Sequence, residues 1–104
     1  MQERSAIFRA LGDPSRLAIF ESLARGEAPV KDLTARLRIS QRAVSQHLAA
    51  LRKAGLVTVR RDGRMAYYQV KSSGLKPMVD WMAQYKEFWP GRINRLEALL
   101  KGMD

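Results

Sequence analysis

Apolar residues recur at helical spacing along the first third of the chain. The first stripe ends before Gly12. Asp13 followed by Pro14 is typical of the start of a second helix. The aspartate can cap the helix, and proline is tolerated at the first helical position because a backbone N–H there has no partner within the helix. The second helix is expected to end near Gly26, and Pro29 opens a short third helix.

A fourth helix is predicted to begin after Ser40, which is a good N-cap residue. Val44, Leu48 and Leu51 fall at positions i, i+4 and i+7 of this helix, so they share one face and are expected to face the core. Gly55 is expected to terminate the helix.

The apolar period then changes from that of a helix to that of a strand. Leu56 to Val59 is rich in β-branched residues, and Met65 to Val70 is the predicted return strand. Between them, Asp62-Gly63 predicts a two-residue turn of type I′, in which both central residues need positive φ.

A long final helix is predicted from about residue 75 to 101, with a kink or break at Pro90-Gly91. It carries more apolar and aromatic surface than one side of a small domain can cover, which predicts a partner, most simply a second copy, with the first helix packed beside it. A cofactor pocket between the aromatic residues is the alternative. The expected dimer interface comprises Ile7, Leu11, Met78, Met82, Tyr85, Trp89, Ile93 and Leu96.

The predicted third and fourth helices are separated by residues 38–40 alone, which is the spacing of a helix-turn-helix. A hairpin directly after such a pair makes a winged helix-turn-helix. We therefore expect a mainly α fold with a small β-hairpin, formed by residues 1–104 as a single domain.

Charge is concentrated in the same part of the chain. The protein has 104 residues, 19 Lys+Arg and 10 Asp+Glu, with a net charge of +9. Residues 40–64 hold six basic residues and one acid, a net +5, whereas 1–39 and 65–104 each carry only +2. A coat of charge that served solubility would be spread evenly, so the distribution favours a polyanionic partner such as nucleic acid.

The polar face of the predicted fourth helix has side chains that pair with base edges, since arginine suits guanine and glutamine suits adenine. The expected base contacts are Gln41, Arg42, Ser45 and Gln46. The expected contacts to the DNA backbone, which supply affinity more than sequence choice, are Ser40, His47, Arg52, Lys53, Arg60, Arg61 and Arg64.

Other classes of function find little support in the composition. The chain has no cysteine and a single histidine, His47, so a thiolate or multi-histidine metal site is not expected. The sequence shows no carboxylate pair, no nucleophile–base set and no glycine-rich phosphate loop, so an enzyme is not expected. We expect no membrane span, no cofactor and a cytoplasmic location.

Four stretches together resemble the ArsR/SmtB family of winged-helix repressors, over roughly residues 4–72. They are Leu11-Gly12-Asp13-Pro14-Ser15-Arg16-Leu17, Asp32-Leu33, Ser40-Gln41-Arg42-Ala43-Val44-Ser45-Gln46-His47-Leu48 and Leu51-Arg52-Lys53-Ala54-Gly55-Leu56-Val57. The resemblance implies a winged-helix fold, dimerisation through the first and last helices, and repression of nearby promoters.

The chain departs from the family's metal-sensing patterns. Arsenic-sensing members have cysteines flanking a valine at the start of the third helix, where this chain has Pro29 and Lys31 around Val30. The final helix lacks the histidines of zinc-sensing members, and its tryptophans resemble the metal-independent, SdpR-like branch. Arg38 stands where many relatives have glycine, which would store about 1 kcal/mol of strain if φ is positive there.

These observations predict a homodimeric, sequence-specific DNA-binding regulator, which represses by occluding a promoter at a palindromic operator. Two alternatives remain: a winged-helix protein-interaction module without specific DNA binding, and an RNA-binding domain. The basic fourth helix argues against the first, and the lack of an aromatic platform argues against the second.

Overall fold

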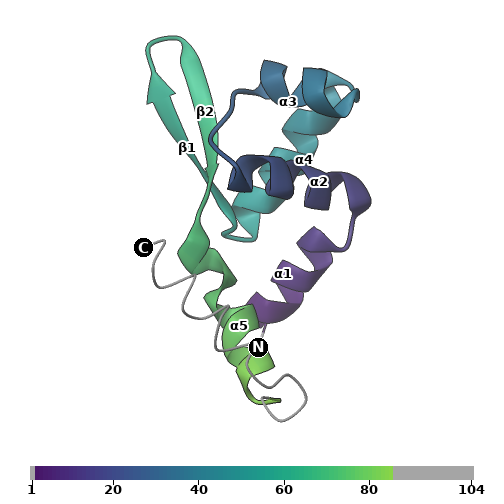
Figure 1. Cartoon of the computed structure of the whole chain (residues 1–104), viewed down its shortest axis with the longest axis vertical. Coiled ribbons are helices and arrows are strands. Elements are labelled where there is room, and N and C mark those ends of the chain that lie inside the picture. The colour runs from purple at the N-terminus through teal and green to yellow at the C-terminus, as the bar shows by residue number, and fades with distance from the viewer. Residues whose placement is uncertain (1, 86–104) are drawn as a thin grey trace.

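The computed structural model describes residues 2–85, with side chains from residue 4 onward. In order, the elements are α1 (Gln2–Leu11), α2 (Pro14–Ala24), α3 (Val30–Leu37), α4 (Gln41–Lys53), β1 (Val57–Asp62), β2 (Met65–Val70), the 3₁₀ turn η1 (Ser72–Leu75) and α5 (Lys76–Ala83). The hairpin projects from the helical body, and α5 lies at the opposite end of the molecule from α3 and the hairpin tip (Figure 1). This confirms the predicted fold class.

The link between α1 and α2 is stabilised by two caps. The Asp13 carboxylate accepts a hydrogen bond from the backbone N–H of Arg16 at 2.9 Å, as expected of an N-cap residue. The Arg16 guanidinium donates to the carbonyl oxygens of Ala10 (2.7 Å) and Arg9 (3.3 Å), which are left without helical partners at the end of α1. The motif thus fixes where one helix ends and the next begins.

The core forms where α2, α3, α4 and the base of the hairpin meet. Val44, Leu48 and Leu51 are at most 1% exposed, which confirms the predicted buried face of α4. They belong to one cluster with buried side chains from the other elements, namely Ile7, Ala10, Ile19, Leu23, Ala28, Leu33, Leu56 and Val57. The fourth helix therefore has one face anchored in the core and one face directed outward.

The turn between α3 and α4 occupies residues 38–40, as predicted. Ser40 Oγ accepts a hydrogen bond from the backbone N–H of Ala43 at 3.0 Å and caps α4. Arg38 has φ 57° and ψ 39° and ends α3 in the left-handed region. It is the one non-glycine residue with positive φ in the described part of the chain. The expected conformational strain at Arg38 is therefore present.

The predicted hairpin is present, but the predicted turn is wrong by one residue. Asp62 pairs with Met65 across the strands, so the two central residues of the turn are Gly63 and Arg64. Of these only Gly63 has positive φ (61°), and Asp62 belongs to β1. Positive φ at the first central position alone is typical of a type II′ turn, which needs glycine only there.

The final helix starts as expected but ends earlier than predicted. After η1, α5 runs from Lys76 to Ala83, and Gln84 forms its C-cap. The helix thus ends before Pro90, whose predicted kink lies outside the described residues together with the rest of the segment. The first helix packs against α5, as the predicted pairing of the terminal helices requires. No helix in residues 2–85 is long and apolar enough to span a bilayer.

Gly74 marks a close approach between η1 and the segment that joins α4 to β1. A Cβ at this position would collide with the carbonyl oxygen of Gly55 and lie 3.4 Å from the Cα of Leu56. We therefore expect Gly74→Ala to lower the free energy of unfolding by about 1–3 kcal/mol, because backbone must move to accommodate the methyl group. Urea denaturation measures the change, and the exposed neighbour Ser73→Ala should stay within about 0.5 kcal/mol of wild type. Equal stability of the two variants would contradict the tight packing.

Candidate nucleic-acid interface

The outward face of α4 carries the side chains predicted to contact bases. Gln41, Arg42, Ser45 and Gln46 are all exposed, and their positions place them on the first two turns of the helix. The buried Val44 and Leu48 hold the opposite face in the core. The fold therefore brings all four predicted residues together on one surface with hydrogen-bonding groups directed to solvent.

The predicted backbone-contact residues lie in several environments. Arg52 and Lys53 are exposed on the last turn of α4. Arg61 and Arg64 are exposed at the tip of the hairpin and form no ion pair within residues 2–85. Ser40 already uses its hydroxyl oxygen to cap α4, although the hydroxyl hydrogen can still donate.

Arg60 differs from the other two hairpin arginines because it has partners inside the chain. Its Nη2 and Nε donate to the two carboxylate oxygens of Glu27 at 2.7 and 3.2 Å. Its guanidinium also lies 4.8 Å from the ring centroid of Tyr67. The sequence placed Arg60 among the expected contacts to the DNA backbone, because nothing local to β1 shows that Glu27 lies beside it.

His47 faces the start of α2. Its Nδ1 lies 4.0 Å from Oδ2 of Asp13, and 22% of the side chain is exposed. The backbone N–H and guanidinium of Arg16, together with His47, hold the pKa of the Asp13 carboxyl below its ordinary value despite the opposing desolvation. The sequence alone does not show this approach, because Asp13 lies 34 positions away at the start of another helix. Within residues 2–85, no cluster of three or more His, Cys, Asp or Glu could hold a metal ion.

The predicted dimer residues fall into three groups. Leu11, Met78 and Met82 are half-buried and Tyr85 is 40% exposed, so each has surface that a partner could cover. Ile7 is 1% exposed and packs in the core of its own chain, so it has no surface to offer. The remaining three, Trp89, Ile93 and Leu96, lie outside the described residues.

Two aromatic residues at the α1–α5 contact were missed as interface candidates. Phe8 is 42% exposed, and its ring packs edge-on against Trp81, with centroids 5.5 Å apart and planes at 78°. The ring centroid of Trp81 in turn lies 5.2 Å from that of Tyr85. We call Phe8, Trp81 and Tyr85 the aromatic cluster. The signal available in the sequence was the position of Trp81 one residue before Met82, on a neighbouring stripe of the same helix.

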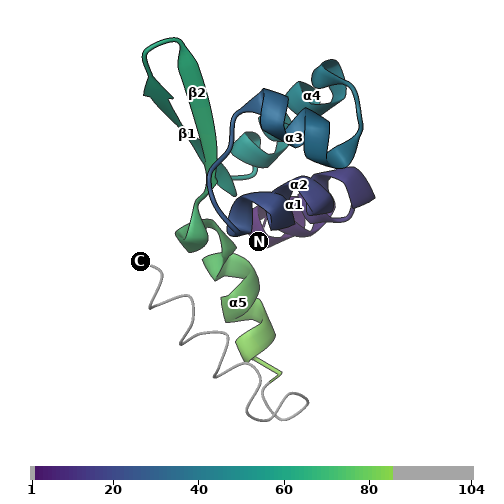
Figure 2. The ribbon, with the colours of Figure 1, turned by 45° about the horizontal axis from the view of Figure 1, so that its top comes forward.

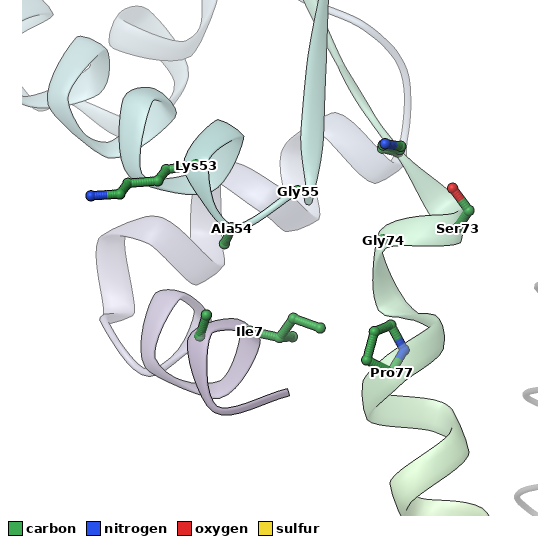
Figure 3. A pocket seen from close by; sticks show the side chains of 9 residues that line it. Ile7, Lys53, Ala54, Gly55, Ser73, Gly74 and Pro77 are labelled. Atoms are coloured by element: carbon green, nitrogen blue, oxygen red, sulfur yellow. The ribbon is translucent and has the colours of Figure 1, made fainter. Parts of the chain in front are cut away.

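A hollow of about 510 Å³ lies between α1, the C-terminal end of α4 and the link from β2 to α5 (Figure 3). Ile7 and Ala54 line one side, and Gly74 and Pro77 line the other. The Lys53 side chain extends away from Gly74 and Pro77 in this view. Lys71 and Ser73 also line the hollow, and the other lining residues are small or apolar.

A helix-turn-helix pair with an outward polar face, followed by a hairpin bearing exposed arginines, defines a winged helix-turn-helix DNA-binding protein. The model of the arsR family of bacterial regulatory proteins matches residues 13–59. The chain is 37% identical over 84 residues to the transcriptional activator HlyU of Vibrio cholerae, covering 77% of this chain and 78% of that relative. The chain belongs to the arsR family and is a DNA-binding transcriptional regulator.

Other relatives agree on the family. A transcriptional repressor SmtB homolog of Synechocystis is 46% identical over 69 residues, covering 66% of this chain and 52% of that protein, so the chain spans about half of its length. Among solved structures, an ArsR-like transcriptional regulator from Rhodococcus sp. RHA1 has a TM-score of 0.76 and 28% identity, with 94% of this chain and 92% of that one covered. The predicted family is thus confirmed.

Proposed function

We propose that this protein is a repressor that binds as a homodimer to a palindromic operator and occludes a promoter. The observation that carries the proposal is the exposed set of Gln41, Arg42, Ser45 and Gln46 on one face of α4, at the position of a recognition helix. The hairpin tip and α3 lie at one end of the molecule and α5 at the other (Figure 1). One end can therefore contact DNA while the other contacts a second subunit.

The proposed dimer surface is the aromatic cluster together with the half-buried residues of α1 and α5. It comprises Phe8, Leu11, Met78, Trp81, Met82 and Tyr85. Exposed aromatic and methionine side chains are enriched in the cores of protein interfaces. Two copies joined through this surface would present two α4 helices to half-sites about one turn of DNA apart.

The proposal is tested by selecting duplexes from random DNA with the purified full-length chain and footprinting the best sequence. We expect an enriched site with two inverted half-sites about 10–10.5 base pairs apart, and a dimeric mass in light scattering at micromolar concentration. Enrichment of a single half-site with a monomeric mass would overturn the dimer. Single-stranded RNA that competes as well as duplex DNA would favour the RNA-binding alternative.

We also propose that the protein works in the cytoplasm as a non-enzymatic, metal-independent regulator of the SdpR-like branch. The absence of cysteine from the sequence supports a signal other than a metal. The transcriptional repressor SdpR of Bacillus subtilis is 29% identical over 79 residues, which is compatible with this branch. Operator binding that is unchanged by EDTA and by added zinc or arsenite is the expected result.

Arg61 at the hairpin tip offers a test of backbone contact. Because it is exposed and has no ion pair in the described chain, we expect Arg61→Ala to weaken binding to the operator and to random duplex by the same factor. The slope of log affinity against log salt should decrease by about 1, since one phosphate contact is lost. Lys76→Ala on α5, whose ammonium is paired with Asp80, should leave the slope unchanged. An unchanged slope in Arg61→Ala would exclude the contact.

A further inference from the structure

Three residues from three segments meet on the outer face of the hairpin. Arg60 of β1 is opposite Tyr67 of β2 in the strand register, so both side chains share one face. Glu27 precedes Ala28, whose backbone pairs with Tyr68 along the other edge of β2 through hydrogen bonds of 2.9 and 3.0 Å. The Arg60 side chain therefore lies over the Tyr67 ring and reaches across β2 to Glu27. We call Glu27, Arg60 and Tyr67 the clasp.

The clasp uses two of the five N–H donors of Arg60. Nε and Nη2 both donate to Glu27, and Nη1 lies 3.8 Å from Oδ2 of Asp62. Hydrogen bonding to Arg60 holds the pKa of the Glu27 carboxyl below its ordinary value, so Glu27 is ionised at neutral pH. Glu27 thus holds the edge of the guanidinium formed by Nε and Nη2, and a phosphate that required this edge would have to displace Glu27.

The outer half of the hairpin has few other attachments. Val57 at its base is 3% exposed, whereas Arg60, Arg61 and Asp62 are all exposed. A two-stranded hairpin is only marginally stable by itself. The direction in which the tip points therefore depends on what joins the hairpin to the helical body beyond its base, namely the backbone pair of Ala28 with Tyr68 and the clasp beside it. Figure 2 shows the hairpin standing clear of the helices above its base.

We propose that Arg60 is a positioning residue: the clasp fixes the angle between the hairpin and the helical body, so that Arg61 and Arg64 are held where they meet the DNA backbone. This inference rests on the proposed mode of DNA binding. It assigns to Glu27 a favourable role in DNA binding, although a carboxylate repels phosphate. Whether affinity for DNA falls or rises when Glu27 loses its charge therefore distinguishes the clasp from the alternative, in which Arg60 leaves Glu27 to bind a phosphate.

The decisive variant is Glu27→Gln, assayed against the selected operator over a range of salt concentrations. Loss of the clasp should weaken binding about three- to tenfold, with an unchanged salt slope, because the phosphate-contacting arginines remain but are no longer held in place. If Arg60 contacts a phosphate and Glu27 only competes for it, the same substitution strengthens binding and overturns the proposal. Glu21→Gln removes the same charge from an exposed site on α2 and should change affinity less than twofold.

Arg60→Gln and the double variant with Glu27→Gln complete a cycle. Residues that act as one unit are not additive, so the double variant should bind no more weakly than Arg60→Gln alone. A salt slope that falls by about 1 in Arg60→Gln would identify a phosphate contact and contradict the positioning role.

Hydrogen exchange of the free protein tests the clasp without DNA. Amides of β1 and β2 should exchange faster in Glu27→Gln and Arg60→Gln, whereas those of α4 stay unchanged. Unchanged exchange in the hairpin would overturn the clasp whatever the DNA result. If the wild-type chain fails to select an operator, the proposed function fails while this measurement still decides whether the clasp holds the hairpin.

Discussion

Leu48→Ala should lower the free energy of unfolding by about 2–5 kcal/mol, which is more than the loss expected of Gly74→Ala. Leu48 is 1% exposed and lies between Val44 and Leu51 on the buried face of α4, so truncation leaves a cavity at the centre of the core. Small domains are stable by about 5–15 kcal/mol, so a large share of the stability would be lost. Urea denaturation followed by far-UV circular dichroism measures the change.

Gln46→Ala is the matched control on the same helix. Gln46 is exposed, so its removal should change stability by no more than about 0.5 kcal/mol while weakening operator binding. A loss of stability in Leu48→Ala and a loss of operator binding without a loss of stability in Gln46→Ala would show that α4 has one structural and one functional face. Similar destabilisation by both substitutions would contradict the burial pattern of the helix.

Arg42→Ala should weaken binding to the selected operator by about 1–3 kcal/mol and relax the preference at one base pair. Arg42 is exposed on the first turn of α4, where a recognition helix enters the major groove, and its fork of donors matches the acceptors of guanine. The measurement is a competition titration against operators substituted at each position, at one fixed salt concentration.

The comparison with random duplex separates base contact from backbone contact. Arg42→Ala should lose more affinity for the operator than for random DNA, whereas Arg61→Ala should lose the same factor on both. Equal loss on both duplexes in Arg42→Ala would place this arginine among the backbone contacts. Urea denaturation of Arg42→Ala should match wild type, because its side chain is exposed.

Much of the fold could be predicted because its determinants are local. Asp13 and Ser40 cap the helices that follow them through backbone groups three residues ahead, and such bonds need no distant partner. Val44, Leu48 and Leu51 share a face by helical geometry alone. The candidate site followed from the same periodicity, since the residues opposite a buried stripe must face outward.

The errors occurred where a choice between local alternatives depended on contacts with another element. Asp62-Gly63 and Gly63-Arg64 both contain the glycine that the turn needs, and the pairing of Asp62 with Met65 selected the second. Ile7 is another case, because α1 has two apolar sides. Packing against the core took Ile7 to 1% exposure and left Phe8 at 42%.

The sequence by itself determined α1 to α4, the caps at Asp13 and Ser40, the presence of the wing and the polar face of α4, because each depends on residues within a turn or on the opposite strand position. Only the tertiary structure decided which charged and aromatic groups have partners. Arg60 meets Glu27 across 33 residues, His47 meets Asp13 between two helices, and Phe8 meets Trp81 between α1 and α5. Such contacts arise from how separate elements pack, which no local pattern of residues specifies.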